Sequence, residues 1–249
     1  MAKRVRILAG PNGSGKSSVY EILKQNKDFK WGVFVNADEI EKQLRTAQYI
    51  DISTYGIDNF AWESFVREYQ SFLDAKKGKC NVDNLLYVDN RIIAIKTEFV
   101  DSYLACYIAE FIRRELLQAK KDFTFTVETV MSHPSKLDFM RKARERGFKV
   151  YLYYVSTSSP EINIGRVAAR VQRGGHNVSE EKIRSRYVRS LANLRDAILL
   201  SDRAYIFDNS TSSYKWIAEY DRSTSELTFK VDEVPQWFVE NIMKPSDCQ

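Results

Sequence analysis

The sequence predicts an α/β protein with a doubly wound, mainly parallel five-stranded sheet and helices on both of its faces. Two observations support this fold: short apolar runs alternate with segments of helical periodicity, and the run at residues 148–155 is β-branched and aromatic on both faces, as in a strand covered by helices. Strands that alternate with helices are joined by crossovers, which makes them parallel and buries them between helical layers. The composition, 44% hydrophobic and 29% charged, fits a globular protein with a sizeable core.

The elements follow one another along the chain as this fold requires. The strands are expected at residues 4–9, 32–35, 123–127, 148–155 and 204–207. The helices are expected at residues 17–25, 135–146, 160–171 and 179–200. Near the C-terminus, residues 216–220 and 227–231 flank a polar turn and predict an antiparallel hairpin, and residues 235–243 predict a short closing helix.

We expect one domain over residues 1–249, because no linker-like stretch divides the chain. Residues 41–121 have mainly helical periodicity and are interpreted as a helical insertion, whose helices either pack on one another or form one wall of an acceptor pocket. No apolar run approaches the roughly 18 residues of a membrane helix, and the first residues lack a signal-peptide pattern. The sequence therefore predicts a cytoplasmic protein with no membrane partner.

The most specific motif is Gly10-Pro11-Asn12-Gly13-Ser14-Gly15-Lys16-Ser17, which matches G-x-x-x-x-G-K-[ST] directly after the first strand. Its glycines let successive backbone N–H groups point at phosphate oxygens, and the following helix adds its positive N-terminal end. Lys16 would reach the β and γ phosphates, and the Ser17 hydroxyl would ligate Mg²⁺. The motif predicts a P-loop NTPase that binds ATP and Mg²⁺ at these residues and at Ser18.

Two acidic residues are expected close to these phosphates. Asp38 follows the second strand and Glu128 ends the third, and groups beyond the carboxyl ends of parallel strands gather at one edge of the sheet. Asp38 could accept the proton of an acceptor hydroxyl, or it could cap the next helix. Glu128, beside Thr129, could bind substrate hydroxyls or hold Mg²⁺ through water, or it could simply end a polar strand.

Positive charge gathers in one segment of the chain. Between Arg166 and Arg189 there are seven basic residues and two acidic ones, a local balance equal to the net charge of +5 of the whole chain. A general nucleic-acid-binding surface would be broader and more basic. This focused charge therefore suits a polyphosphate better than a nucleic acid.

Three of these arginines, Arg166, Arg170 and Arg173, share one face of a predicted helix that leads into Gly174-Gly175-His176. Residues 160–178 are interpreted as a lid with a flexible junction, which brings guanidinium groups onto the β and γ phosphate oxygens, or as a solvated basic face. The other arginines are expected to remain surface charges or ion-pair partners. These are Arg184, Arg186 and Arg189.

Taken together, six segments resemble the zeta-toxin-like P-loop kinases, and within them a branch described as predicted ATPases. The segments are AGPNGSGKSS (9–18), VNADEI (35–40), VETVMS (127–132), GRVAARVQRGGHNV (165–178), IRSRYVRSLANL (183–194) and IFDNS (206–210). The first segment is shared with many families, whereas its combination with NADEI and RVxxRVxxGGH is much more specific. Residues 41–121 match no substrate-binding pattern of this family.

The resemblance implies ATP and Mg²⁺ at Lys16 and Ser17 and a catalytic base at Asp38. It also implies substrate contacts near Glu128 and Thr129 and phosphate-binding arginines at Arg166 and Arg173. Zeta toxins phosphorylate the sugar of UDP-N-acetylglucosamine and are held inactive by a cognate antitoxin. A nucleotide sugar and an antitoxin are therefore the partners that the resemblance suggests.

The residues favour a kinase that transfers the γ-phosphate of ATP to a hydroxyl of a small molecule, with UDP-N-acetylglucosamine as the first acceptor to test. Two other interpretations stay open. A polynucleotide 5′-hydroxyl kinase would bind its substrate with a steep salt dependence. A non-catalytic ATP-dependent switch would need Lys16 but tolerate the loss of Asp38.

Overall fold

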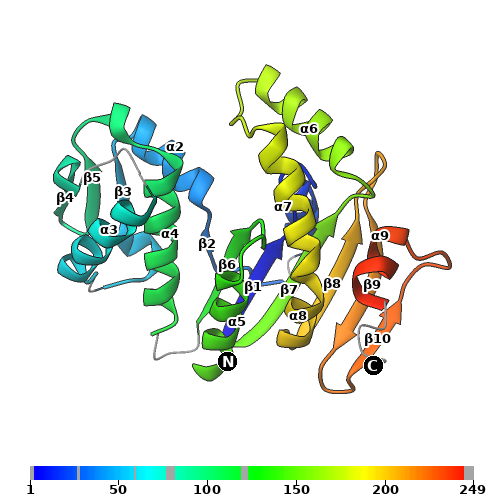
Figure 1. The fold of residues 1–249 in the computed structure, drawn as a ribbon. Coiled ribbons are helices and arrows are strands. Elements are labelled where there is room, and N and C mark those ends of the chain that lie inside the picture. The colour runs from blue at the N-terminus through cyan, green and yellow to red at the C-terminus, as the bar shows by residue number, and fades with distance from the viewer. Residues whose placement is uncertain (1–2, 27–28, 59, 77–81, 119–122, 244–249) are drawn as a thin grey trace. The chain divides into compact units, whose positions relative to one another are not determined.

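The computed structural model describes residues 3–26, 29–58, 60–76, 82–118 and 123–243, which form two compact units (Figure 1). Unit 1 comprises Met1–Trp31 and Thr129–Gln249, and unit 2 comprises Gly32–Glu128. Unit 2 thus contains the predicted insertion together with the strands that flank it. The organisation of the chain as one domain stays a prediction, and each unit is described by itself.

The sheet of unit 1 has the strand order β10-β9-β8-β7-β1. The strands β1 (Arg4–Ala9), β7 (Lys149–Ser156) and β8 (Arg203–Asp208) are parallel to one another. The strands β9 (Lys215–Asp221) and β10 (Glu226–Phe229) form the predicted hairpin, which pairs antiparallel with β8 and extends the sheet. The mainly parallel sheet and the C-terminal hairpin are therefore confirmed.

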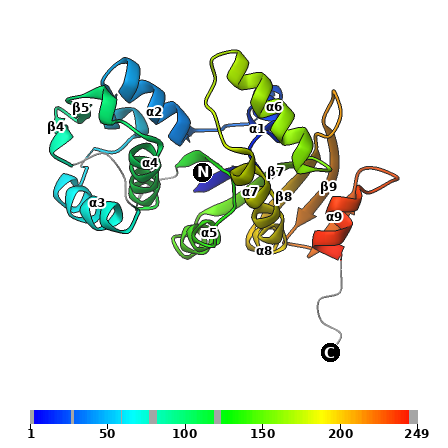
Figure 2. The same cartoon turned by 45° about the horizontal axis from the view of Figure 1, so that its top comes forward.

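Helices cover both faces of this sheet (Figures 1 and 2). Tyr153 and Tyr154 are neighbours on β7 and point to opposite faces. The Tyr153 ring lies 5.0 Å from that of Trp31, which contacts Tyr20 of α1 (Lys16–Lys24). The Tyr154 hydroxyl lies 2.9 Å from Ser190 Oγ of α7 (Glu180–Ala192). Because α1 covers one face and α7 the other, the sheet of unit 1 is doubly wound as predicted.

Three more helices are described in unit 1, in the segments that connect the strands of this sheet. They are α5 (Ser135–Glu145), α6 (Pro160–Gln172) and α8 (Leu194–Leu200). The single helix predicted over residues 179–200 is in fact two helices, α7 and α8, which meet at Asn193. The predicted closing helix is one turn, α9 (Gln236–Phe238), followed by a π-helical turn (Val239–Met243).

In the part that the structure describes, unit 2 contains a parallel strand pair and three helices. The pair is β2 (Val33–Val35) and β6 (Thr124–Thr129), of which the last residue belongs to unit 1. The helices are α2 (Ala37–Thr46), α3 (Trp62–Lys76) and α4 (Ser102–Leu116). Short 3₁₀ turns lie at Ile52–Tyr55, Val82–Asn84 and Thr97–Phe99.

Unit 2 also contains a small antiparallel sheet that the sequence analysis did not predict. Its strand order is β3 (Tyr49–Asp51), β5 (Arg91–Ala94) and β4 (Leu85–Val88). Asp89 and Asn90 connect β4 to β5 with φ angles of 50° and 61°, the left-handed values that a two-residue hairpin turn needs. This Asp-Asn pair between two apolar runs was the signal for the hairpin. Among the helices that the structure describes, none is long and apolar enough to cross a membrane.

Candidate nucleotide-binding site

The phosphate loop, residues 10–17, joins β1 to α1, and its three glycines leave no room for a side chain. Gly13 and Gly15 have φ angles of 77° and 93°, which other residues rarely adopt. A Cβ atom at Gly13 would lie 2.5 Å from the carbonyl oxygen of Asn163, and one at Gly15 would lie 2.0 Å from Nδ2 of Asn209. The loop therefore packs directly against α6 and against the segment after β8.

Lys16 and Ser17 begin α1, as the motif requires. Lys16 is buried, and its ammonium group donates hydrogen bonds to the carbonyls of Gly10 (3.0 Å) and Pro11 (3.1 Å). Ser17 and Ser18 are exposed in the first helical turn, where the backbone N–H groups and the helix dipole favour an anion. In the described ranges, no group of three His, Cys, Asp or Glu side chains could hold a metal ion. The Ser17 hydroxyl is the group in this loop suited to a Mg²⁺ ion that phosphates also ligate.

The loop is also tied to the chain that follows β6. Gly10 N–H donates to the Thr129 carbonyl at 3.2 Å, and the Thr129 hydroxyl accepts from Met131 N–H at 3.1 Å. Met131 has a φ of 58°, and its carbonyl accepts from Nδ2 of Asn193 at 2.8 Å. Asn193 thereby holds this strained segment at the junction of α7 and α8. The predicted contact of Thr129 with substrate stays a prediction.

Arg166 of α6 points at the phosphate loop. Its Nη2 donates to the Thr211 carbonyl at 3.0 Å, whereas Nη1 is buried and, among the described residues, has no hydrogen-bond partner. Nη1 lies 4.0 Å from the position that a Cβ of Gly15 would take. A buried donor without an acceptor costs about 1–3 kcal/mol. A phosphate oxygen at the loop would satisfy it.

Two more buried polar atoms near the loop also lack a hydrogen-bond partner among the described residues. Ser14 Oγ and Asn163 Nδ2 have no hydrogen-bond partner in the part of the chain that is described, and both residues are fully buried. Ser14 lies in the phosphate loop, and Asn163 lies on the part of α6 that packs against this loop. Both atoms, like Arg166 Nη1, therefore belong to residues beside or within the loop. These three atoms fit a loop that binds a polar, anionic ligand.

Arg170 and Arg173 lie at the other end of α6. Gly174 N–H donates to the Val171 carbonyl and has a φ of 82°, while Gly175 N–H donates to the Arg170 carbonyl. These bonds form a regular helix C-cap where a flexible junction was expected. Arg170 Nη2 donates to the His176 carbonyl at 2.8 Å, and Arg173 is exposed. Nucleotide contacts of these two arginines stay predictions.

Arg186 of α7 is a site residue that the sequence analysis missed. It was expected to remain a surface charge, and this was wrong, because its Nη1 donates to Asn12 Oδ1 in the phosphate loop at 3.2 Å. Arg186 lies at helical spacing from Ile183 and Ser190, which are both buried in the structure, so the contact depends on which face of α7 packs inward.

The two other arginines of α7 behave as expected. Arg184 pairs with Glu161, and the hydrogen bond from Arg184 lowers the pKa of that carboxyl below its ordinary value. Arg189 donates to the Ser185 carbonyl of its own helix at 3.2 Å. Neither contact involves the phosphate loop.

A buried hydrogen-bond chain positions α6 and α7 at the end of β7. Tyr187 of α7 donates its hydroxyl proton to the Thr157 carbonyl at 2.6 Å, and Thr157 Oγ1 donates to Asn163 Oδ1 at 2.6 Å. Burial raises the pKa of Tyr187 to about 12, so its hydroxyl remains a donor at neutral pH. The chain fixes both helices that carry arginines toward the loop.

The segment after β8 supplies another residue that was not singled out from the sequence. Asn209 Nδ2 donates to the Ser14 carbonyl at 2.8 Å, and Asn209 N–H donates to the Ser156 carbonyl at 2.8 Å. The Asp-Asn-Ser run directly after a buried strand is typical of a side-chain-stabilised turn and could have indicated this position. Asn209 thus links the ends of β7 and β8 to the phosphate loop.

Asp38 and Glu128 belong to unit 2, where the structure brings them together through Asn36. Asn36 Oδ1 accepts from Asp38 N–H at 2.8 Å, and Asn36 Nδ2 donates to Glu128 Oε2 at 3.0 Å. Asn36 is therefore the cap of α2, and the alternative that Asp38 caps this helix was wrong. The Asp38 carboxylate is exposed, and in the described ranges it has no hydrogen-bond or ion-pair partner.

Comparison with known proteins agrees with the fold. The AAA_33 family, an AAA domain, matches residues 5–191. An uncharacterised protein from Haemophilus influenzae is 38% identical over 68 residues, which are 27% of this chain and 49% of that protein. This chain therefore spans about half of that relative. The family match and the loop together identify a P-loop nucleotide-binding domain.

Two solved structures are similar at the level of the fold. The crystal structure of AvrRxo1-ORF1:AvrRxo1-ORF2 with sulphate ions has a TM-score of 0.59 at 14% identity, over 99% of this chain and 65% of that one. The structure of AvrRxo1-ORF1:-ORF2 with ATP has a TM-score of 0.56 at 14% identity, over 92% of this chain and 61% of that one. At this identity the similarity shows the fold alone.

Proposed function

Since the chain belongs to the AAA_33 family, we propose that it is an ATP-dependent phosphotransferase, which moves the γ-phosphate of ATP to a hydroxyl of a small molecule. The main support is the buried Nη1 of Arg166, which has no hydrogen-bond partner among the described residues and is aimed at a phosphate loop that contains Lys16 and is contacted by Arg186. Phosphoryl transfer requires positive groups around the transferred phosphate, because its equatorial oxygens carry the charge of the transition state. A solved structure of the same fold contains ATP, which also supports this choice of donor.

Each group in unit 1 has a distinct role in this proposal. Backbone N–H groups of the phosphate loop and the ammonium of Lys16 bind the phosphates, and the Ser17 hydroxyl holds Mg²⁺. Mg²⁺, when bound, neutralises phosphate charge. Arg166 and Arg186 stabilise negative charge on the γ-phosphate as it leaves ADP. The predicted contacts of Arg170 and Arg173 with the β and γ phosphates remain part of the proposal.

The residues proposed to contact the acceptor are Asp38, Glu128 and Thr129. Asp38 is the proposed base for the acceptor hydroxyl, since its carboxylate is exposed and is not engaged as a cap. Glu128, oriented by Asn36, and Thr129 are the proposed contacts to the other hydroxyls. A nucleotide sugar such as UDP-N-acetylglucosamine is the first acceptor to test, and an inhibitory antitoxin is the partner to seek.

The deciding experiment incubates the protein with Mg-ATP and a metabolite extract and looks by mass spectrometry for species that gain one phosphate. We expect such a product, and we expect its loss in Lys16→Ala, which also loses nucleotide affinity. In Asp38→Asn the product should be lost while nucleotide binding persists. Glu39→Gln is the matched control, because Glu39 is an exposed carboxylate in the same helical turn and should keep activity.

Other results would favour the alternatives. A product formed only on oligonucleotides with a 5′-hydroxyl would identify a polynucleotide kinase. If no acceptor gains phosphate while the wild type binds ATP and Asp38→Asn behaves like it, the protein acts as a nucleotide-dependent switch.

A further inference from the structure

A buried contact in unit 1 involves a residue beyond the part of the chain that the family matches. Trp237 lies in α9, whereas the family match ends at residue 191. The Trp237 side chain is buried, and its indole N–H donates to Oδ2 of Asp208 at 2.6 Å. Asp208 is the last residue of β8 and is also buried.

Asp208 determines how the chain turns after β8. Its Oδ1 accepts from Ser210 N–H at 3.0 Å, and its Oδ2 accepts from Ser210 Oγ at 2.8 Å. Ser210 Oγ in turn accepts from Ser158 N–H at 2.8 Å. The carboxylate therefore fixes the turn on both sides of Asn209, whose amide binds the Ser14 carbonyl in the phosphate loop. A hydrogen bond from Trp237 to Asp208, the peptide bond from Asp208 to Asn209 and a hydrogen bond from Asn209 to Ser14 therefore connect α9 to the phosphate loop.

The indole is well suited to hold this carboxylate. A buried carboxylate is costly unless donors surround it, and a hydrogen bond to an ionised acceptor is shorter and stronger than a neutral one. Indole Nε1–H is a donor only, so the contact cannot reverse its direction. Without it, Oδ2 would keep only the Ser210 hydroxyl as a donor among the described residues, and the orientation of the turn that carries Asn209 would be less restricted.

We propose that Trp237 is a positioning residue for the phosphate loop, which acts through Asp208 and Asn209 on Ser14. This inference rests on the proposed function in one respect, that the loop binds ATP. It assigns to the C-terminal segment of the chain a part of the nucleotide affinity. Gly15 reinforces the assignment, because the Asn209 amide sits so close to it that no side chain fits between them.

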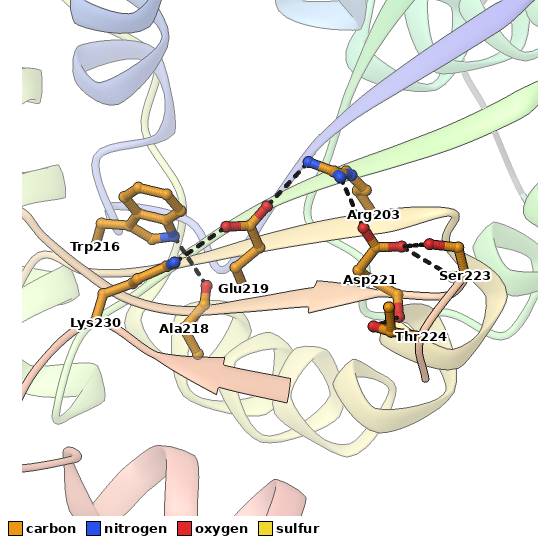
Figure 3. Close-up of polar contacts among 8 residues, drawn as sticks. All are labelled: Arg203, Trp216, Ala218, Glu219, Asp221, Ser223, Thr224 and Lys230. Atoms are coloured by element: carbon orange, nitrogen blue, oxygen red, sulfur yellow. Dashed lines mark hydrogen bonds and ion pairs between the residues drawn. The ribbon is translucent and has the colours of Figure 1, made fainter. Parts of the chain in front are cut away.

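The test compares Trp237→Phe with Trp216→Phe. Each variant removes one indole N–H and keeps an aromatic ring, but Trp216 donates to the Ala218 carbonyl on the hairpin, at 3.0 Å (Figure 3). The dissociation constant of Mg²⁺ with a non-hydrolysable ATP analogue is measured by calorimetry, well below the melting temperature of each variant. We expect about fivefold weaker binding for Trp237→Phe, as for the loss of one hydrogen bond, and unchanged binding for Trp216→Phe.

A double-variant cycle separates positioning from a general loss of stability. Asn209→Ala should also weaken binding, and the double variant with Trp237→Phe should be no weaker than Asn209→Ala alone. Equal affinity of the Trp237→Phe and Trp216→Phe variants, or effects of Trp237→Phe and Asn209→Ala that multiply, would overturn the inference. If the wild type itself fails to bind the analogue, the proposed function fails; if it binds and only the expected Trp237 effect is missing, only the inference fails.

Discussion

Unit 1 contains two clusters of polar side chains that differ in how well their members satisfy one another. Where β8 meets the hairpin, Arg203 of β8 pairs with Glu219 (3.3 Å) and Asp221 (2.7 Å) of β9, and Lys230 pairs with Glu219 (3.4 Å) (Figure 3). Around the phosphate loop, Arg166 Nη1 is buried without a partner among the described residues.

The contrast teaches how to distinguish a structural cluster from a binding site. Both clusters contain arginines, but the hairpin supplies its own counter-charges and lies at the surface, where ion pairs contribute little. At the loop, donors are withdrawn from water and the described residues offer them no acceptor, which a folded protein tolerates where a ligand binds. The guanidinium group alone is therefore a poor guide to function.

The largest effect is expected on the phosphotransfer rate, when one arginine of each cluster is replaced by methionine. Arg166→Met should lower the phosphotransfer rate by about 100-fold, because a preorganised donor to the transferred phosphate is lost. Arg203→Met should leave the rate within about twofold. Steady-state kinetics with ATP and the identified acceptor measures both. Equal losses in the two variants would show that the distinction between the clusters is not functional.

An intermediate effect concerns the fit between the phosphate loop and α6. Gly13→Ala should lower the free energy of unfolding by about 1–3 kcal/mol, because Gly13 has a positive φ and the new methyl group would meet the Asn163 carbonyl. Gly165→Ala is the matched control within α6, since, apart from the neighbouring backbone of α6 itself, no atom of the described residues lies within 4 Å of its added Cβ. Replacing a helical glycine there should stabilise the protein slightly. Urea denaturation measures both, and a stable Gly13→Ala variant would contradict the tight packing.

The smallest expected effect is a pH dependence on the hairpin. Hydrogen bonds from Ser223, and then the charge of Arg203, lower the pKa of Asp221 below its ordinary value of 3.8. A carboxyl whose pKa is lowered in the folded state stabilises the fold at pH values above its ordinary pKa. This contribution to stability is lost as the pH falls through the folded-state pKa. Asp221→Asn should therefore flatten the acid side of the stability curve slightly and leave neutral-pH nucleotide affinity unchanged. Urea titrations from pH 5 to about pH 2 test this, and an unaltered curve would refute it.

The parts of the fold that the sequence predicted depend on local signals. The phosphate loop is set by glycines and Lys16 within eight consecutive positions, and β7 by an unbroken apolar run. The sheet β3-β5-β4 was missed because its strands have three or four residues, too few to show a period among amphipathic helices.

The parts of the site that were missed depend on tertiary packing. Arg186 reaches Asn12 across 174 positions of sequence, and this contact depends on how α7 is rotated about its axis. The role of Asn36 as a cap was missed because Asp38, two residues later, was the capping candidate taken from the sequence, and the backbone geometry shows that the helix begins after Asn36. Sequence motifs thus identified the phosphate loop, whereas the residues that contact this loop could be identified only in the three-dimensional structure.

The hairpin has one further consequence, for the behaviour of the protein at high concentration. β10 is the outer strand of the sheet of unit 1, and outer strands expose backbone groups that can pair with those of another molecule. β10 has only four residues and is followed directly by the ion-paired Lys230. Short, charged edges resist such pairing. By ending the sheet in this way, the hairpin keeps the apolar strand β8 from becoming an edge along which molecules could aggregate.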